Sequence, residues 1–219
     1  SSSDANARAA AIEVLANRGR RDLIPTFFKY AEGESEASKA AVKAIGSIGD
    51  ISNLEQLIKL MVAKEGTAGS RDVLKAVVDV MRRTADQAKA VEILVSQMDG
   101  ASARSQASML QALGQTGSKE ALVWLAKACR SSDEKLQKTA IKLLGGWKDK
   151  NGIPTMLELA GDDSIALANH VTLMRGVSRL LAAENPKRLK RPLVEQALET
   201  CRRSEEKEAI PATLDKLQK

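Results

Sequence analysis

The stretch "KAIGSIGD", Lys43 to Asp50, places two glycines three residues apart beside an apolar run. Glycine-rich turns bind phosphate when their N–H groups face the ligand, but the dinucleotide and P-loop motifs use other spacings and follow a strand. Here the preceding residues have a helical pattern. We therefore interpret Gly46 as a position of close helix approach. Gly49, like Gly19 and Gly117, is predicted to end its helix in the left-handed conformation.

The side chains that most often catalyse reactions or bind metals are few and scattered. His170 is the single histidine, and its register with Leu173 and Val177 places it on the apolar side of a helix. Cys129 and Cys201 lie far apart at apolar helical positions and lack zinc-site spacing, so we expect small buried side chains. The sequence therefore predicts no catalytic residue, no metal site and no cofactor.

Basic residues near the predicted turns are the strongest indication of binding. In a stacked repeat, equivalent turns lie along one edge, and a row of cations there could contact phosphates. Against this stand Asp50 at one turn and the near absence of aromatic side chains that could stack on bases. Ordinary solvated turns are the alternative. The candidate residues at the turns are Arg18, Arg20, Arg21, Arg82, Arg83, Lys148 and Lys150.

Two further features extend this candidate surface. The run "PKRLKRP" (186–192) contributes Lys187, Arg188, Lys190 and Arg191, and a charged loop before a helix is the simpler interpretation. Trp147 follows two glycines at a helix end, where we expect an exposed side chain that could contact a partner. Trp124, in contrast, belongs to an apolar helical stripe and is predicted to be partly buried.

The elements that must position these residues form a repeat. "AVKAIGSIGD" (41–50) returns as "MLQALGQTGS" (109–118) and as "AIKLLGGWKD" (140–149). The paired central apolar positions recur at spacings of 30, 36, 32, 31 and 33 residues. A period near 32 residues indicates a helical repeat array. These pairs are Ile12/Leu15, Val42/Ile45, Val78/Met81, Leu110/Leu113, Ile141/Leu144 and Met174/Val177.

Each repeat is predicted to contain an alanine-rich first helix and a shorter apolar second helix. Leu54, Leu57, Ile58 and Met61 follow the i, i+3, i+4, i+7 spacing of a buried helical stripe. Pro25 and Pro154 stand near the starts of second helices, where a missing N–H is tolerated. Ser35 and Asp133 are plausible N-caps of first helices.

One helix pair cannot bury its apolar stripe alone, so the pairs are expected to stack as an all-α solenoid. We expect one solenoid domain over 1–219, with about six antiparallel helix pairs and a C-terminal capping helix. The predicted repeats are approximately 4–33, 35–66, 69–100, 101–131, 133–161 and 163–203, with the cap at 204–219.

The composition agrees with an all-α chain. Aromatic residues make up only 2% of the 219 residues, and the sequence relies on Ala, Leu, Lys, Glu, Gln and Met, which favour helices. The net charge of +6 favours anionic partners mildly, but acidic residues are interspersed with the basic ones. No apolar run is long enough to span a membrane. The start "SSSD" suggests a fragment of a longer protein.

The helix pairs with "AVKAIGSIGD" and "MLQALGQTGS" resemble HEAT repeats of the short bacterial, phycobilisome-lyase-like type, over nearly the whole chain. Repeat three departs from the pattern, since "VVDVMRRTAD" has no glycine. The resemblance implies a non-catalytic scaffold whose second helices form a concave face for a protein partner or for adjacent domains of the same chain. It also favours an extracytoplasmic bacterial setting. We separately expect this fragment to be monomeric.

The alternative function is binding of an anionic polymer, including nucleic acid, along the basic edge. HEAT-like DNA glycosylases show that such a fold can support an enzyme, but no arrangement of residues here argues for that activity.

Overall fold

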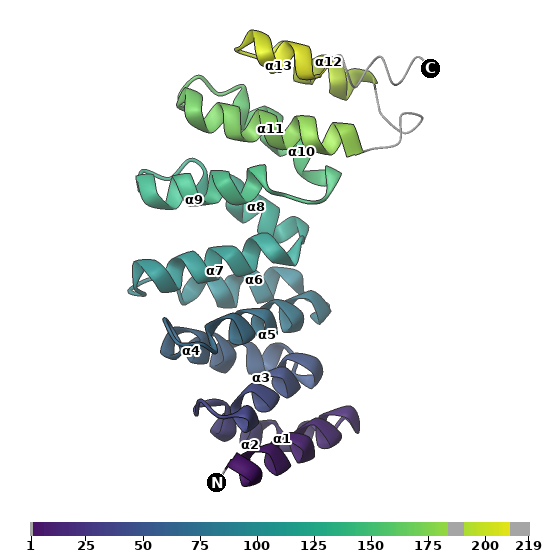
Figure 1. The fold of residues 1–219 in the computed structure, drawn as a ribbon. Helices are drawn as coiled ribbons and strands as arrows, with labels where there is room; N and C mark the ends of the chain where they lie inside the picture. Colours follow the sequence, from purple (N-terminus) through teal and green to yellow (C-terminus); the bar gives the residue numbers. More distant parts are fainter. Residues whose placement is uncertain (1, 184–190, 211–219) are drawn as a thin grey trace. The chain divides into compact units, whose positions relative to one another are not determined.

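The computed structural model describes residues 2–183 and 191–210. Within these residues the regular structure is helical and no strand occurs, which confirms the all-α solenoid class (Figure 1). Short 3-10 turns precede three of the helices: η1 (Arg21–Leu23), η2 (Ile51–Asn53) and η3 (Lys150–Gly152).

The described helices form consecutive pairs, as the repeat predicts. The first helices are α1 (Ser2–Asn17), α3 (Glu36–Ile48), α5 (Ser70–Arg83), α7 (Ala103–Thr116), α9 (Glu134–Gly145) and α11 (Leu167–Ala183). The second helices are α2 (Ile24–Ala31), α4 (Leu54–Ala63), α6 (Gln87–Ser96), α8 (Lys119–Ala128), α10 (Ile153–Ala160) and α12 (Arg191–Thr200). A further helix, α13 (Ser204–Ala209), begins the predicted cap, and residues 211–219 of that cap lie outside the described residues.

The chain forms two compact units, Ser1–Glu120 and Ala121–Lys219, and the division falls in the first turn of α8. In the first unit, α3 contacts α1 and α5, and α5 also contacts α7. In the second unit, α11 contacts α9 and α10, and α12 and α13 pack onto this group. The single domain expected from the sequence remains a prediction.

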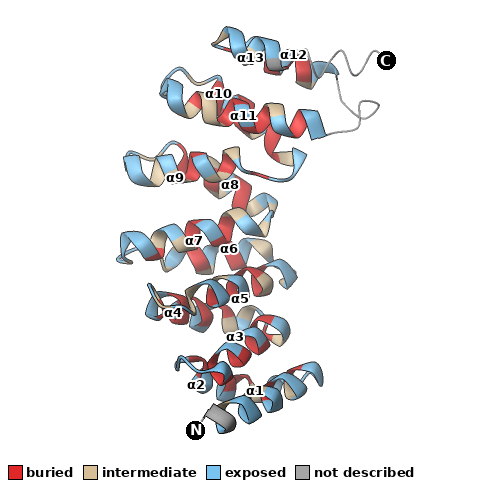
Figure 2. Ribbon diagram, viewed as in Figure 1, coloured by how far each residue is buried: buried red, intermediate tan, exposed pale blue. Residues whose placement is uncertain are grey.

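The core of each unit is built from the apolar stripes read from the sequence, and Figure 2 shows buried residues along the helices of both units. Leu54, Leu57 and Ile58 are fully buried, and Met61 is 4% exposed. The central pairs of all six repeats are buried, apart from the intermediate Leu15 in the first one. The apolar period therefore identifies the core of both units.

Small residues allow the first helices to approach closely. A Cβ atom added to Gly46 would lie 3.0 Å from both Cα and Cβ of Ala76 on α5. In the second unit, a Cβ on Gly176 would lie 2.7 Å from the main-chain oxygen of Gly145. The interpretation of Gly46 as a position of close helix approach is confirmed.

The prediction that Gly49 is left-handed is wrong. Its φ is −66°, whereas Gly19 and Gly117 do have positive φ values of 69° and 73°. Gly49 donates its N–H to the main-chain oxygen of Ile45 at 2.8 Å, and a Cβ on Gly49 would lie 2.5 Å from that oxygen. Crowding against the last turn of α3, rather than φ, excludes a side chain at Gly49.

The predicted helix starts are confirmed. Pro25 and Pro154 lie in the first turn of α2 and α10. The Ser35 side chain accepts a hydrogen bond from the Ser38 N–H, and that of Asp133 accepts from the N–H groups of Lys135 and Leu136.

Candidate interaction surfaces

Two arginines of the predicted basic edge contact neighbouring repeats. At the end of α5, Arg83 donates from Nη2 to the main-chain oxygen of Gly49 at 3.0 Å. Arg82 donates from Nε to the main-chain oxygen of Gln115 at 3.1 Å. Both acceptors lie at helix C-termini, where carbonyl groups lack intrahelical partners and the helix dipole is negative. These guanidinium groups therefore connect α5 to α3 on one side and to α7 on the other.

The turn between α1 and α2 contains both an arginine and its carboxylate partner. Arg20 donates to Asp22 through two bonds, of 2.8 and 2.6 Å. The hydrogen bond from Arg20 lowers the pKa of Asp22. The pKa of Asp50 is lowered mainly by its hydrogen bond from Ser52, with a smaller contribution from the charge of Arg21. Arg18 is exposed. Acidic side chains thus partly neutralise this end of the edge.

A third arginine, which was not among the residues predicted from the sequence, makes the same kind of connection at the turn after α9. Arg179 on α11 donates from Nη2 to the main-chain oxygens of Gly145 at 3.2 Å and of Trp147 at 2.5 Å. Arg179 lies two residues after Val177, as Arg83 lies two residues after Met81, and this shared register was the available signal. Lys148 and Lys150 are exposed at the same turn.

The expectation that Trp147 is exposed is wrong, because its side chain is only 2% exposed. The turn after α9 folds back, so the indole packs against Gly152, where an added Cβ would lie 2.6 Å from the ring. The indole Nε1 donates to Oδ1 of Asn151 at 2.8 Å. A buried indole N–H needs such a partner, and Asn151 four residues later was the signal. Trp147 is a core residue, and the intermediate exposure of Trp124 agrees with its prediction.

Most of the last basic run lies outside the described residues, namely Lys187, Arg188 and Lys190. Arg191 begins α12, is exposed, and pairs with Glu195 at 3.1 Å. An exposed i, i+4 pair of this kind adds little stability.

Lys64 makes a comparable connection between repeats after the second helices. It is only 6% exposed, and its ammonium donates to the main-chain oxygen of Gly33. The same oxygen accepts from the Ser38 hydroxyl at 2.6 Å. Lys64 thereby joins the end of α4 to the loop after α2. No periodic pattern of residues indicated this contact, because a single lysine at a helix end is ordinarily solvated.

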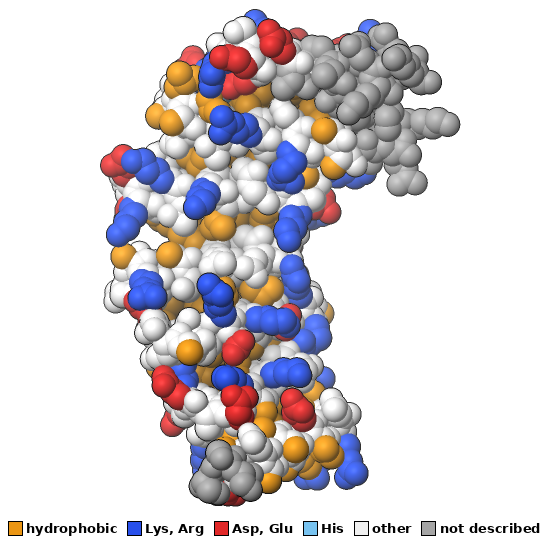
Figure 3. Space-filling model, viewed as in Figure 1, with side chains coloured by type: hydrophobic (Ala, Val, Ile, Leu, Met, Phe, Trp, Pro, Cys, Tyr) orange, Lys and Arg blue, Asp and Glu red, His pale blue; other side chains and the backbone are white. Residues whose placement is uncertain are grey.

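A cavity of about 300 Å³ lies on the first-helix face of the first unit. Its small lining residues come from α1, α3 and α5: Ala9, Ala40, Gly46 and Ala76. Its charged lining residues are Glu13, Glu36, Lys39, Lys43, Asp72, Lys75 and Asp79. Several of these pair locally, including Lys43 with Glu13 at 3.6 Å and Lys75 with Asp79 at 2.5 Å. Figure 3 shows acidic and basic side chains intermixed over the helices of this unit.

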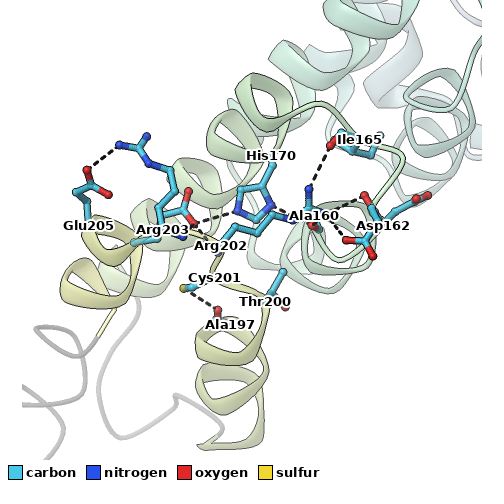
Figure 4. Close-up of polar contacts among 12 residues, drawn as sticks. Ala160, Asp162, Ile165, His170, Ala197, Thr200, Cys201, Arg202, Arg203 and Glu205 are labelled. Atoms are coloured by element: carbon cyan, nitrogen blue, oxygen red, sulfur yellow. Dashed lines mark hydrogen bonds and ion pairs between the residues drawn. The ribbon is translucent and has the colours of Figure 1, made fainter.

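His170 occupies a buried polar cluster in the second unit (Figure 4). The ring is 0% exposed, which confirms that it faces the apolar side of its helix. Nδ1 lies 3.0 Å from the main-chain oxygen of Ala160, and Nε2 lies 3.0 Å from Oε2 of Glu206 on α13. Both nitrogens are therefore used in contacts between elements of the same unit.

Arg202 closes the same cluster. Its guanidinium donates to the main-chain oxygens of Ala160 at 3.0 Å, Asp162 at 2.9 Å and Ile165 at 3.2 Å. These oxygens belong to the end of α10 and the loop that follows. Arg202 thus caps α10 from the segment that joins α12 to α13.

The two cysteines are free and buried. Burial raises the pKa of the Cys129 thiol to about 12 and also raises that of Cys201. A thiol must ionise to act as a nucleophile or metal ligand, so burial of these two cysteines favours a packing role over a reactive one. The described residues contain no group of three or more His, Cys, Asp or Glu side chains placed for a metal ion.

Helix pairs joined by contacts from one repeat to the next define a helical-repeat protein. A family model of HEAT repeats matches residues 1–68 and 91–175, which is more than half of the sequence. The chain belongs to the HEAT-repeat family. A comparison with curated proteins found no match. Among the described helices, none combines the length and apolar character needed to cross a membrane.

Proposed function

We propose that this chain is a non-catalytic scaffold that binds a protein partner, or an adjacent domain of its own full-length protein, through the first-helix face of its first unit. Protein-interaction scaffolding is the general role of HEAT repeats, and this proposal places the contact on α1, α3 and α5. The cavity there is the observation that supports it.

The chemistry of that surface suits a protein ligand. Its small residues leave space for side chains of a partner, and its charged residues of both signs can pair with complementary groups. Lys43 is 79% exposed and 3.6 Å from Glu13, so this weak pair can exchange partners at little energetic expense. The resemblance to HEAT repeats instead implied a partner on the second helices.

The non-catalytic part of the proposal follows from how the reactive groups are used. Both ring nitrogens of His170 contact structural partners, and Cys129 is buried with a pKa of about 12. A general base or a nucleophile must instead reach a substrate in a suitable protonation state.

Anionic-polymer binding has less support. Arg20, Arg82 and Arg83 already contact a carboxylate or main-chain oxygens, so they present fewer donors to phosphate. Fluorescence anisotropy with labelled duplex and single-stranded DNA at low salt tests this alternative. Affinity that falls steeply with salt would favour it over the scaffold proposal.

Site-specific photo-crosslinking tests the scaffold proposal. A photoreactive residue replaces Lys43 in the full-length protein, expressed in its native host, and crosslinked partners are identified by mass spectrometry. The control position is Lys59 on α4, which is 64% exposed and pairs with Glu55. We expect a specific partner at Lys43 only.

The location of the interface is then tested by measuring the affinity of two variants for the purified partner. Lys75→Glu reverses one charge beside the cavity, and Lys59→Glu reverses the lysine of a similar i, i+4 pair elsewhere. Binding weakened about tenfold by Lys75→Glu alone supports the proposal. Equal affinities of the two variants would move the interface away from this face.

A further inference from the structure

The His170 imidazole is the middle member of a hydrogen-bonded chain inside the second unit. The chain runs from the main-chain oxygen of Ala160 through the imidazole to the Glu206 carboxylate, with 3.0 Å at each contact of the ring. His170 lies on α11 and Glu206 lies on α13, so these hydrogen bonds connect α13 to α11 and to the end of α10.

The contact with Ala160 fixes one proton. A carbonyl oxygen can only accept, so Nδ1 must carry a hydrogen. The same oxygen also accepts from Arg202 at 3.0 Å, which reinforces its role as an acceptor. The ring nitrogen that is left for Glu206 is therefore Nε2.

The contact with Glu206 requires a second proton. Nε2 and Oε2 are both acceptors unless one of them is protonated, and two acceptors at 3.0 Å repel. Oε2 also receives the N–H groups of Arg202 at 3.1 Å and Arg203 at 3.3 Å, which favours an ionised carboxylate. The closed arrangement is therefore an imidazolium–carboxylate pair, with one proton more than a neutral imidazole and a carboxylate.

We propose that His170 and Glu206 form a proton-dependent clasp that holds α12 and α13 against α10 and α11. Closing the clasp keeps Val194, Ala197 and Ile210 buried, and losing its proton favours release of the segment. The other charged or titratable groups around it are Asp162, Asp163, Cys201, Arg202, Arg203, Glu205 and Lys207.

The direction of the pH dependence follows from the proton count. Where the imidazole of the released segment is neutral, closing the clasp requires uptake of a proton. The clasp therefore weakens as the pH rises.

The single histidine makes the first test direct. Nitrogen-15 NMR of the imidazole in the 219-residue chain reports which nitrogens carry protons. We expect both nitrogens to be protonated at pH 6.5. A neutral ring with its proton on Nε2 alone would overturn the proposal, because Nδ1 would then face Ala160 without a hydrogen.

Hydrogen exchange measured by mass spectrometry supplies the second test. Glu206→Gln removes the negative charge that stabilises the extra proton. The Oε2 position meets both the two main-chain N–H groups and Nε2, so an amide oxygen placed there still accepts from the N–H groups but offers no donor to neutral Nε2. Glu205→Gln is the matched control on the same turn, since Glu205 pairs with Arg203 and not with His170. Comparison at each pH cancels the intrinsic pH dependence of exchange.

As the pH rises from about 6 to 8.5, we expect protection of α12 and α13 to fall by up to about tenfold per pH unit in the native chain and in Glu205→Gln. Protection in Glu206→Gln should lie below the native value at about pH 6 and should change less over the same range. Coinciding pH profiles for the native chain and Glu206→Gln would overturn the clasp.

Discussion

The guanidinium of Arg83 donates to the main-chain oxygen of Gly49 across 34 residues of sequence, and Arg179 repeats this contact with Gly145 at the same sequence separation. Each arginine lies two residues after the second central apolar residue of its helix. The two units thus use one register position to tie a first helix to the end of the preceding first helix. A basic residue at a turn is here a connection between repeats.

Replacing Arg179 by alanine should destabilise the chain by about 1 kcal/mol, because two main-chain oxygens lose a charged donor at a partly exposed site. Urea denaturation followed by circular dichroism measures this change. Arg175→Ala on the same helix is the control, since Arg175 is exposed, and its effect should stay within about 0.5 kcal/mol. Equal losses in the two variants would contradict a structural role for Arg179.

Trp147→Ala should destabilise the chain by about 3–5 kcal/mol, as large-to-small changes in a core do. The side chain is 2% exposed and donates to Asn151. The comparison variant is Trp124→Ala, whose side chain has intermediate exposure, and its loss should be smaller. Urea denaturation of both variants measures the loss in the free energy of unfolding. A near-native midpoint for Trp147→Ala would show that the indole is not part of the core.

Gly46→Ala should destabilise the first unit by about 1–3 kcal/mol, although alanine favours helices, because the new methyl group would lie 3.0 Å from Ala76. Ala76→Gly removes the opposing methyl group. The double variant should be more stable than the sum of the single changes predicts, and a thermodynamic cycle from thermal unfolding measures that coupling. Additive effects would exclude a direct clash.

Cys129 should make the chain less stable as the pH rises. Its pKa is raised by burial to about 12, while an unfolded thiol ionises near pH 8.5. The unfolded chain therefore releases a proton first, and stability falls by up to about 1.4 kcal/mol per pH unit in this window.

Urea denaturation of Cys129→Ala at pH 8, 9 and 10 should show a smaller loss of stability than the native chain shows. Cys201→Ala is the comparison, because Cys201 is 9% exposed and Cys129 is 0% exposed. An unchanged pH slope in Cys129→Ala would contradict the burial argument.

The fold was predictable because the same apolar pattern recurs at a nearly constant spacing in every repeat. Leu57 and Ile58, like the central pairs of the other repeats, occupy positions that only stacked helix pairs can bury. Local rules also worked at Pro25 and Ser35, whose roles depend on the adjacent backbone alone.

The surface was harder to predict, because the direction of a long side chain depends on what the neighbouring repeat presents. Arg82 and Arg83 are adjacent in sequence yet contact helices on opposite sides of α5. Trp147 was expected to be exposed because it follows two glycines at a helix end. The path of the turn after Gly146, which buries the indole, cannot be predicted from composition. The burial of His170 was predictable, whereas its pairing with Glu206, 36 residues away, depends on how the cap packs.

The arginine contact has a consequence for shortening or extending this chain by design. The position of Arg83 is occupied by Ser47, Gln115 and Gly146 in other helix pairs, and only the third and sixth pairs carry an arginine there. Deleting the third pair alone would place Gln115 opposite Gly49 and leave that carbonyl without its cation. Deleting the third, fourth and fifth pairs together would place Arg179 there instead. Arginine at this register position therefore recurs after three helix pairs, whereas the apolar pattern recurs in every pair.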